Sequence, residues 1–398
     1  MMQIEEIEAA RVLLDGVART TPLEGSRALA EQVGGPVYLK CENLQRTGSF
    51  KIRGAYVRIA RLTPEERANG VVAASAGNHA QGVALAASLL GCTATVFMPV
   101  GAPIPKVQAT KAYGAQVRLE GDTVDDALVA AHRFAADTGA VLIHPFDHLD
   151  VIAGQGTVGL EILEQCPDVK TVVVCTGGGG LISGIASAVK ALRPDVQVVG
   201  AQAAGAAAFP ASLAAGHPLR LASMSTMADG IAVGCPGDLT FAHVRDLVDR
   251  VVTVDEEALS RALLLSLERA KLVIEPAGAA GLAAVMQDPT SFEPPVVVVL
   301  SGGNIDPLLL SKVIRHGLIA AGRFLSMTVR IPDRPGELAR LLGVLAEVGA
   351  NVLDVEHQRT GKELHLDEVE VEVQIETRGS EHSDAVVAAL RAATFSIV

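Results

Sequence analysis

Short apolar runs alternate with helical patterns between residues 70 and 305. The runs are VVAAS (71–75), TATVFMP (93–99), AQVRL (115–119), AVLIHP (140–145), TVVVCT (171–176), VQVVGAQ (196–202) and VVVVLSGG (296–303). Continuous β-branched runs are typical of strands buried on both faces, as in a parallel sheet. Helical spacing follows two of them, in Ala84, Leu85, Ser88 and Leu89 and in Leu181, Ile185, Val189 and Leu192. The pattern predicts an α/β fold with two doubly wound, mostly parallel sheets.

The pattern changes near residue 325. SMTVRI (326–331) and EVEVEVQIE (368–376) alternate apolar with polar residues, as strands with one buried face do. Between them, GELARLLGVLAEVGA (336–350) carries one apolar helical stripe, made of Leu338, Leu341, Leu342, Leu345 and Val348. We therefore predict a separate α+β module of βαββαβ order over 326–398. The stretch HGLIAAGRF joins it to the preceding part.

Composition and charge narrow the class of protein. The chain of 398 residues has 49% hydrophobic and 20% charged residues, no Trp, and a net charge of -12. Nucleic acids and anionic membranes both select basic surfaces, so neither is an expected partner. Apolar runs such as VVVVL (296–300) are too short to cross a bilayer.

The cysteines and the first residues bear on the compartment. Five cysteines are scattered without a C-x-x-C pair, which argues against a disulfide framework and a zinc site. The segment MMQIEEIEAARVLLDG is acidic and amphipathic and lacks the basic n-region of a signal peptide. We expect no signal peptide and a cytoplasmic location.

Four consecutive glycines, Gly177, Gly178, Gly179 and Gly180, stand between a buried strand and a helical pattern. Main-chain amides at a helix N-terminus attract anions, and glycine allows a close approach. The dinucleotide pattern G-x-G-x-x-G does not fit, because Ile182 stands where its last glycine would be. No G-K-[ST] follows, which argues against a nucleotide triphosphate. We predict a single phosphate held by amides.

Two further strands end in turns that suit a ligand, and open α/β sheets bind ligands at such strand ends. SAGNHAQG (75–82) follows VVAAS, and its Ser75 and main-chain amides are suited to a carboxylate. Asn78 and His79 at a helix start are equally typical of a simple N-cap. SGGN (301–304) follows VVVVL, and Ser301 is suited to bond a ring nitrogen.

Lys51 lies in GSFKIRG (48–54), between Phe50 and Ile52. Loss of hydration lowers the pKa of an amine and makes it a nucleophile toward an aldehyde. The alternative is an ordinary surface lysine. A phosphate turn, a carboxylate turn, a serine for a ring nitrogen and a buried amine together predict pyridoxal 5'-phosphate as the cofactor.

A resemblance adds to this interpretation. Six motifs stand in order over residues 20–305: TPLEGSRALAEQVGGPVYLKCENLQRTGSFKIRGA, SAGNHAQGVALAA, TGGGGLISG, ADGIAV, EPAGAAG and SGGN. They resemble the threonine dehydratase (threonine ammonia-lyase) group of fold type II pyridoxal-phosphate enzymes. DRPGELARLLGVLAEVGANVLDV (333–355) looks like an ACT domain, whose usual work is to bind a small amino acid. The domains implied are a large catalytic one (1–61 and 151–320), a small one (62–150) and an ACT domain (326–398).

The resemblance also implies roles. Lys51 would bind the cofactor covalently and, once displaced by substrate, remove the Cα proton. Phe50 would flank the ring, Asn78 would bond its phenolic oxygen, Gly177 to Gly180 would hold the phosphate, Ser301 would bond the ring nitrogen, and Ser75, Gly77, Asn78 and His79 would bind the substrate carboxylate. A serine at the ring nitrogen leaves the pyridine neutral, unlike an aspartate, and this favours loss of a β-hydroxyl over reprotonation.

Four positions refine the expected chemistry. Related serine racemases have a second serine, acting as an acid, where Ala76 stands, so racemisation is expected to be poor. Those racemases also carry a cation site of acidic residues, but the corresponding GAQAAGAAAFP (200–210) has no acid, so no metal is expected there. Glu275 and Asp229 are further candidates for the site, although Glu275 has the alternative of capping the helix after Pro276.

We expect β-elimination of L-threonine to 2-oxobutanoate and ammonia, with L-serine giving pyruvate as a secondary activity. The role in metabolism is isoleucine biosynthesis or catabolism, and a homodimer or homotetramer is implied. Serine racemase or 3-hydroxyaspartate dehydratase of the same fold are alternatives. A non-catalytic amino-acid sensor is an alternative from another class.

The turn of Asp333, Arg334, Pro335 and Gly336 is where ACT domains usually receive an amino acid. Isoleucine or valine is the effector expected there. A regulatory role requires the effector to bind differently to two states of the enzyme. The alternative is that the module only pairs subunits, since a fold alone does not establish a ligand.

Overall fold

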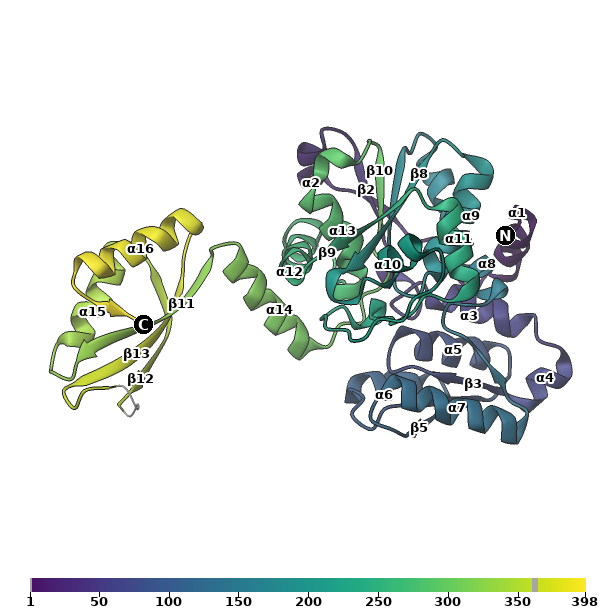
Figure 1. Cartoon of the computed structure of the whole chain (residues 1–398), viewed down its shortest axis with the longest axis horizontal. Coiled ribbons are helices and arrows are strands. Elements are labelled where there is room, and N and C mark those ends of the chain that lie inside the picture. The colour runs from purple at the N-terminus through teal and green to yellow at the C-terminus, as the bar shows by residue number, and fades with distance from the viewer. Residues whose placement is uncertain (1, 360–363) are drawn as a thin grey trace. The chain divides into compact units, whose positions relative to one another are not determined.

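The computed structural model describes residues 2–359 and 364–398. Residues 360–363, within the predicted ACT domain, lie outside the described residues. The chain divides into a unit that ends at Pro307 and a unit that begins at Leu308. The described residues form a six-stranded sheet and a four-stranded sheet in the first unit and a four-stranded sheet in the second (Figure 1).

The first unit is built of short strands and intervening helices. Its strands are β1 (Leu23–Gly25), β2 (Val37–Lys40), β3 (Val71–Ala74), β4 (Ala94–Met98), β5 (Gln116–Leu119), β6 (Val141–Leu142), β7 (Thr171–Cys175), β8 (Gln197–Ala203), β9 (Arg250–Val254) and β10 (Val296–Val299). Its α-helices are α1 (Ile4–Leu13), α2 (Arg27–Val33), α3 (Lys51–Ala60), α4 (Pro64–Asn69), α5 (Asn78–Leu89), α6 (Ile104–Ala112), α7 (Val124–Thr138), α8 (Leu149–Gln165), α9 (Gly180–Leu192), α10 (Ala208–Ala215), α11 (Asp238–Leu247), α12 (Glu256–Leu265) and α13 (Pro276–Gln287). Shorter helical turns are η1 (Glu42–Leu44), η2 (Ala204–Ala206), η3 (Asp229–Ile231), η4 (Ser266–Ala270) and η5 (Pro289–Ser291).

The larger sheet has the order β1-β2-β10-β7-β8-β9. All its pairings are parallel except that of β1 with β2. Helices α13 and α9 pack on opposite sides of this sheet (Figure 1), so Val172, Val173 and Val174 of β7 are all buried. The sequence prediction of parallel strands buried on both faces is confirmed here. It missed β1 and β2 on one side of the predicted strands and β9 on the other.

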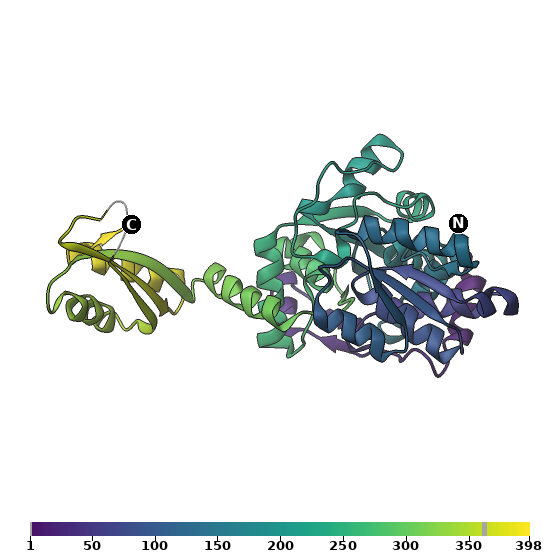
Figure 2. The same ribbon diagram turned by 90° about the horizontal axis from the view of Figure 1, so that it is seen from below.

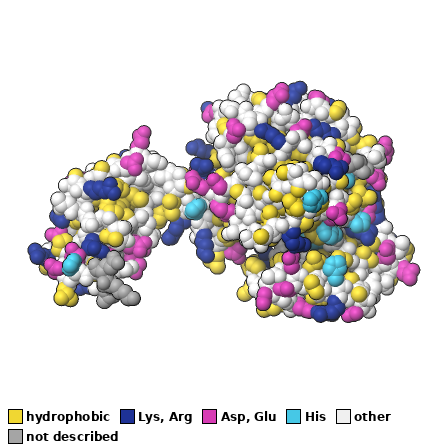
Figure 3. Space-filling model, viewed as in Figure 1, with side chains coloured by type: hydrophobic (Ala, Val, Ile, Leu, Met, Phe, Trp, Pro, Cys, Tyr) yellow, Lys and Arg dark blue, Asp and Glu magenta, His cyan; other side chains and the backbone are white. Residues whose placement is uncertain are grey.

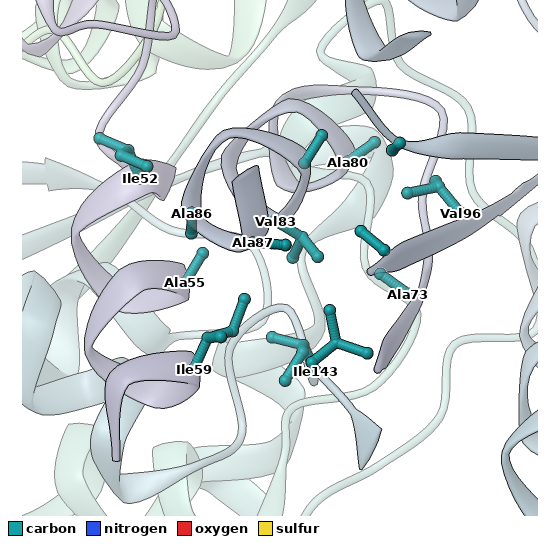
Figure 4. Close-up of a cluster of buried hydrophobic side chains, with 14 of the residues drawn as sticks. Ile52, Ala55, Ile59, Ala73, Ala80, Val83, Ala86, Ala87, Val96 and Ile143 are labelled. Carbon is teal, nitrogen blue, oxygen red and sulfur yellow. The ribbon is translucent and has the colours of Figure 1, made fainter. Parts of the chain in front are cut away.

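The smaller sheet, β5-β4-β3-β6, is parallel throughout. Val71 and Ala73 belong to a buried cluster that also includes residues of α3 and α5. Figure 4 shows side chains of this cluster. Val72 and Ala74 of the same strand belong to a second cluster, with α7. Because successive strand residues face opposite sides, helices on both faces require an unbroken apolar run.

Helix α5 confirms the predicted helix but only part of its predicted buried face. Leu89, part of the predicted apolar spacing, is 47% exposed. The predicted Ala84 does face the cluster and Leu85 is partly buried against it, and the other residues of α5 in the cluster are the small Ala80, Val83, Ala86 and Ala87. Small side chains let α5 lie close to α3, and a Cβ at Gly82 would come 3.0 Å from the main chain of Lys51.

The second unit has the predicted βαββαβ order. Helix α14 (Pro307–Ala320) precedes β11 (Phe324–Pro332), α15 (Glu337–Glu347), β12 (Asn351–Gln358), β13 (Glu368–Glu376), α16 (Ser380–Ala392) and β14 (Ser396–Ile397). The sheet order is β12-β13-β11-β14, with antiparallel pairings. The two helices α15 and α16 lie on one side of it (Figures 1 and 2). Residues 316–320 of the predicted joining stretch belong to α14. The domain boundaries at residues 61, 150 and 320 stay predictions.

Alternation in the second unit matches its burial. Val369, Val371, Val373 and Ile375 of β13 are all buried, and they pack with Leu341 and other residues of α15 and α16. The polar partners of these residues face the other side of the sheet. The predicted antiparallel sheet with helices on one face is confirmed.

Four buried charged residues, the Arg53 cluster, fix the position of α3: Lys40, Glu42, Arg53 and Glu161. Arg53 donates from Nε and a terminal nitrogen to the two oxygens of Glu42 at 2.9 and 2.8 Å. Its other terminal nitrogen donates to Glu161 at 2.6 Å. Lys40 bonds the second oxygen of Glu161, also at 2.6 Å. Two positive and two negative groups thus pair without solvent and join β2, η1, α3 and α8.

Replacement of Arg53 by Met is expected to destabilise the protein by about 3–5 kcal/mol, because Glu42 loses its guanidinium partner while it stays buried. Urea unfolding measures this change. The control is Arg27→Met, since Arg27 pairs with Glu31 on the surface. The control variant is expected to change the free energy of unfolding by about 0.5 kcal/mol or less. Equal midpoints for the two variants would contradict the structural role of the Arg53 cluster.

Candidate active site

Three turns at the carboxyl ends of strands carry the candidate residues. Gly177–Gly180 follow β7, Ser75–His79 follow β3, and Ser301–Asn304 follow β10. Asn304 Nδ2 donates to Asn78 Oδ1 at 2.8 Å, which joins turns from the two different sheets. The two sheets of the first unit therefore present their ligand-binding edges toward each other.

Lys51 is the first residue of α3, and its amine donates to the main-chain carbonyl of Pro145 at 3.0 Å. The Phe50 ring lies beside it, with its centroid 5.1 Å from Nζ. Burial lowers the pKa of Lys51 to about 8, against smaller opposing effects of Cys175 and Glu275. A larger fraction of this amine is therefore uncharged near neutral pH than in a solvated lysine, as a nucleophile or a base requires.

Neighbouring residues close the tetraglycine turn so tightly that side chains do not fit. Gly179 has a φ of 97°, which is left-handed, and Gly180 begins the 13-residue α9. A Cβ at Gly178 would lie 2.4 Å from the ring of Phe146. Thr240 Oγ1 fixes the turn by donating to Gly178 O at 2.6 Å. The turn therefore presents main-chain amides at a helix N-terminus, an arrangement suited to binding an anion.

The turn after β3 offers main-chain and neutral side-chain groups. Ser75 Oγ accepts a hydrogen bond from the Gly77 amide at 3.1 Å, and Asn78 is the first residue of α5. The His79 ring is buried, with Nε2 2.7 Å from the Ile143 carbonyl. Burial lowers the pKa of His79 to about 3, so the ring is neutral at physiological pH. A carboxylate bound here would not be paired with an imidazolium.

Glu275 faces Asn78. It occupies the N-cap position of α13, but its side chain makes no capping hydrogen bond. Its Oε1 instead accepts a hydrogen bond from Asn78 Nδ2 at 2.6 Å. Burial, together with the charge of Asp229, raises the pKa of Glu275 to about 7. The carboxyl group can therefore gain or lose a proton near neutral pH.

Ser301 connects its turn to the segment that carries Lys51. Its carbonyl accepts a hydrogen bond from the Phe50 amide at 3.1 Å, and Ser49 and Gly302 form an antiparallel bridge. The side chain of Ser301 is buried beside Cys175, the last residue of β7. Burial raises the pKa of the Cys175 thiol to about 11, so the thiol is neutral.

Asp229 lies at the edge of this group of residues. Its side chain is 59% exposed, and its carboxylate pairs with Lys106 of α6 at 2.7 Å. This ion pair joins η3 to a helix that packs with the smaller sheet. Asp229 therefore contacts Lys106 and acts on Glu275 only through its charge.

The predicted effector residues form the exposed turn between β11 and α15 of the second unit. The carboxylate of Asp333 lies 3.6 Å from a guanidinium nitrogen of Arg359, and its amide donates to Asp367 O at 2.8 Å. Arg334 and Pro335 follow, and Gly336 has a left-handed φ of 98° directly before α15. The turn thus presents a helix N-terminus to solvent.

Sequence reasoning missed the loop after β6, residues 144–148. Pro145 accepts the hydrogen bond of Lys51, and Phe146 packs on the tetraglycine turn. Asp147 Oδ1 accepts from the Thr240 amide at 3.0 Å, while the Asp147 amide donates to His144 Nδ1 at 2.7 Å. This loop therefore positions the amine and the glycines together. Its place at a strand's carboxyl end was the available signal.

Neither a metal-binding group nor a membrane-spanning helix is found among the described residues. Within residues 2–359 and 364–398, no three His, Cys, Asp or Glu side chains gather in a group able to hold a metal ion. In the same part of the chain, no helix is long and apolar enough to cross a membrane. On the face drawn in Figure 3, positive and negative side chains are interspersed.

Comparison with known proteins identifies the family. Residues 14–302 match the family described as pyridoxal-phosphate dependent enzyme. The chain belongs to the pyridoxal-phosphate dependent enzymes. Residues 326–394 match the ACT domain, so this family's catalytic region is followed here by an ACT domain.

Individual relatives cover much or all of the chain. It is 49% identical to an L-threonine ammonia-lyase of Thermotoga maritima over 397 residues, covering 100% of this chain and 99% of the relative. The solved processed form of threonine deaminase isoform 2 from Solanum lycopersicum is 38% identical, with a TM-score of 0.76, over 79% of this chain and 87% of that one. The structure of maize serine racemase is 39% identical, with a TM-score of 0.75, and the match covers 80% of this chain and 98% of that one.

The residues present fit the cofactor of this family. A phosphate needs clustered donors without bulky side chains, and the tetraglycine turn excludes a Cβ at Gly178 and Gly180. An aldehyde reacts with the uncharged form of an amine, and the lowered pKa of Lys51 increases the fraction of that form near neutral pH. The Phe50 ring beside this amine offers a flat apolar surface to an aromatic ring.

We expect the cofactor-free protein to take up pyridoxal phosphate at a rate that rises with pH and levels off above about 8. The lowered pKa means that Lys51 loses its proton, and becomes reactive, as the pH rises through this value. Stopped-flow absorbance measures the rate, with the free cofactor and Nα-acetyl-lysine amide as the reference reaction. A midpoint near the ordinary lysine pKa of about 10.4 would contradict the assigned environment.

Proposed function

We propose that this enzyme removes water from L-threonine and yields 2-oxobutanoate and ammonia, with L-serine giving pyruvate as a secondary reaction. The substrate choice rests on the 49% identity to the Thermotoga maritima L-threonine ammonia-lyase over the full length of both chains. The site supports a lyase because it combines a reactive amine with a serine, rather than a carboxylate, in the turn after β10. Isoleucine biosynthesis, a cytoplasmic location and a homo-oligomer stay predictions.

The cofactor is held at three points in this proposal. Amides of Gly177 to Gly180 bind its phosphate, Phe50 flanks its ring, and the Ser301 hydroxyl bonds its ring nitrogen. When bound, the cofactor withdraws the electron pair left at Cα of the amino acid. Because a serine hydroxyl does not protonate the ring as an aspartic acid would, withdrawal is weaker and loss of the β-hydroxyl is favoured.

The chain's own groups orient the substrate and move the proton. Ser75, with the amides of Gly77 and Asn78, binds the carboxylate, and the neutral His79 contributes only its main chain. Lys51 Nζ takes the Cα proton, which requires the uncharged amine that burial favours. The buried position beside Phe50 keeps water from competing for this amine.

Racemisation of serine is the second candidate, supported by the similarity to maize serine racemase. A racemase needs an acid on each face of Cα, and Ala76 stands where the resemblance places the second acid in racemases. Lys51 then supplies a proton on one face only. Elimination is the function that these residues favour.

The test is a keto-acid assay across β-hydroxy amino acids with the cofactor-loaded protein. L-Threonine is expected to give equal amounts of 2-oxobutanoate and ammonia, and more efficiently than L-serine gives pyruvate. Lys51→Ala is expected to lose both the activity and the visible absorbance band of bound cofactor. The control Lys106→Ala is expected to keep the band, because Lys106 pairs with Asp229. D-Serine as the main product would instead favour racemisation.

We also propose that the ACT domain adjusts this activity on binding an amino acid at the turn of Asp333 to Gly336. The exposed helix N-terminus there is suited to a carboxylate. Allosteric coupling usually changes an apparent affinity by roughly 5-fold or more.

Isoleucine or valine is accordingly expected to change the threonine concentration at half-maximal rate by about 5-fold or more. Asp333→Ala is expected to abolish the change and to leave the basal rate unaltered. Steady-state kinetics with and without each amino acid measure both. If no amino acid changes the kinetics, the proposal of regulation is wrong, and subunit pairing is the remaining role for the ACT domain.

A further inference from the structure

Asn304 is hydrogen-bonded to oxygens from separate segments of the first unit. Its side-chain Nδ2 lies 2.6 Å from Thr47 O and 2.8 Å from Asn78 Oδ1. A third oxygen, Gln81 Oε1, is 3.4 Å away. Thr47 O is a main-chain carbonyl and can only accept, so only the amino group of Asn304 can face it at this distance. The amide orientation of Asn304 is therefore fixed by its surroundings.

The orientation of Asn304 dictates that of Asn78. With Asn78 Oδ1 accepting from Asn304, the Asn78 amino group faces Glu275 Oε1, 2.6 Å away. If the Asn78 amide were rotated by half a turn, its amino group would face that of Asn304. Its oxygen would then face the carboxyl oxygen of Glu275. The hydrogen bond to Asn304 would be lost, and the one to Glu275 would form only when that carboxyl group is protonated and donates.

Two glycines make this arrangement possible. Gly48 has a left-handed φ of 70°, and a Cβ there would lie 2.3 Å from Asn304 Oδ1. A Cβ at Gly302 would lie 2.3 Å from Glu275 Oε1 and 3.0 Å from Asn78 Nδ2. Glu275 is held in turn by its amide, which donates to Gly302 O at 3.0 Å. The main chain thus keeps space for a continuous line of hydrogen bonds.

We propose that Asn304 is a positioning residue that sets the amide of Asn78 so that Asn78 donates to the phenolic oxygen of the cofactor. One N–H of Asn78 is used by Glu275, and the other remains for that oxygen. The proposal rests on the proposed function and on the contact with the phenolic oxygen that the family resemblance implies for Asn78. It does not depend on which amino acid is the substrate.

Asn304 also ties this orientation to the segment that carries the catalytic amine. Thr47, whose carbonyl accepts the shortest of these hydrogen bonds, precedes Lys51 by four residues, and Ser49 between them forms a bridge with Gly302. The side-chain amide of Asn304 therefore connects three segments: the turn after β10, the segment before α3 and the start of α5.

The experiment measures cofactor binding, without any amino acid, in the full-length protein. Asn304→Asp replaces the donor with a carboxylate that faces three acceptors. It is expected to raise the cofactor dissociation constant by roughly ten-fold or more and to shift the visible absorbance band. Asn304→Ala is expected to raise the constant by less, and Asn304→Ser, which keeps a donor, is expected to retain most of the affinity.

A double-mutant cycle separates positioning from general stability. Asn78→Ala is expected to weaken cofactor binding, and adding Asn304→Ala to it is expected to cause little further loss, since Asn304 acts through Asn78. Losses that simply multiply would overturn the proposal, as would an unchanged band and affinity in Asn304→Ala. Because no substrate is present, the result stands apart from the test of threonine as the substrate.

The matched control is Asn43→Ala. Asn43 is buried, whereas Asn304 is partly buried, and like Asn304 it donates from Nδ2 to a main-chain carbonyl, here Val273 O at 3.1 Å. It bonds no part of Asn78. Its replacement is expected to lower the urea midpoint while the cofactor affinity and the absorbance band stay unchanged. A spectral change equal to that of the Asn304 variants would mean that any loss of packing in this region has the same effect.

Discussion

The buried ion pairs of Arg53 hold the helix on which the rest of the site depends. Residues of an α-helix turn by roughly 100° each, so Arg53 lies on the side of α3 away from Lys51. There it is bonded to Glu42 and Glu161, and Ile52 packs into the cluster shared with α5. Helix α3 is thus held by ion pairs on one side and by apolar packing on another. Its first residue, Lys51, takes part in neither set of contacts. Charges of both signs balance within the Arg53 cluster, which avoids an uncompensated buried charge.

The lowered pKa of the Lys51 amine follows from what surrounds it. The loop at residues 144–148 offers Lys51 a carbonyl oxygen, and Phe50 covers it. No carboxylate is its hydrogen-bond partner among the described residues, so burial outweighs the attraction of Glu275 and lowers the pKa. The same loop presses Phe146 onto the tetraglycine turn. One segment therefore contacts both the Lys51 amine and the tetraglycine turn.

Much of the fold could be predicted from the sequence because local patterns determine it. The unbroken apolar run VVAAS predicted a strand covered by helices on both faces, and helices are found there. The alternation in EVEVEVQIE predicted a strand with one face exposed to solvent, and the burial of β13 alternates in this way. Strand β2 was missed because VYLK ends in a lysine, which suggests a surface. Lys40 is in fact fully buried, since Glu161 pairs with it. Such pairing over 121 positions leaves no local signal.

The candidate site shows the same limit. Lys51, the tetraglycine turn and Ser301 were named from glycine content and strand ends, which are local features. Pro145 and Asn304 act through hydrogen bonds to residues 94 and 226 positions away, and an ordinary proline or asparagine gives no sign of such partners. Glu275 could be assigned to a cap or to the site by sequence, and only its bond to Asn78 distinguishes the two.

The most direct test of the account is the identity of the lysine that binds the cofactor. The cofactor-loaded protein is reduced with borohydride, which makes the link between cofactor and amine permanent, and is then digested for peptide mass spectrometry. The account predicts the added mass on Lys51 and on no other lysine. Labelling of Lys40 or Lys106, or a protein that retains no label, would contradict it.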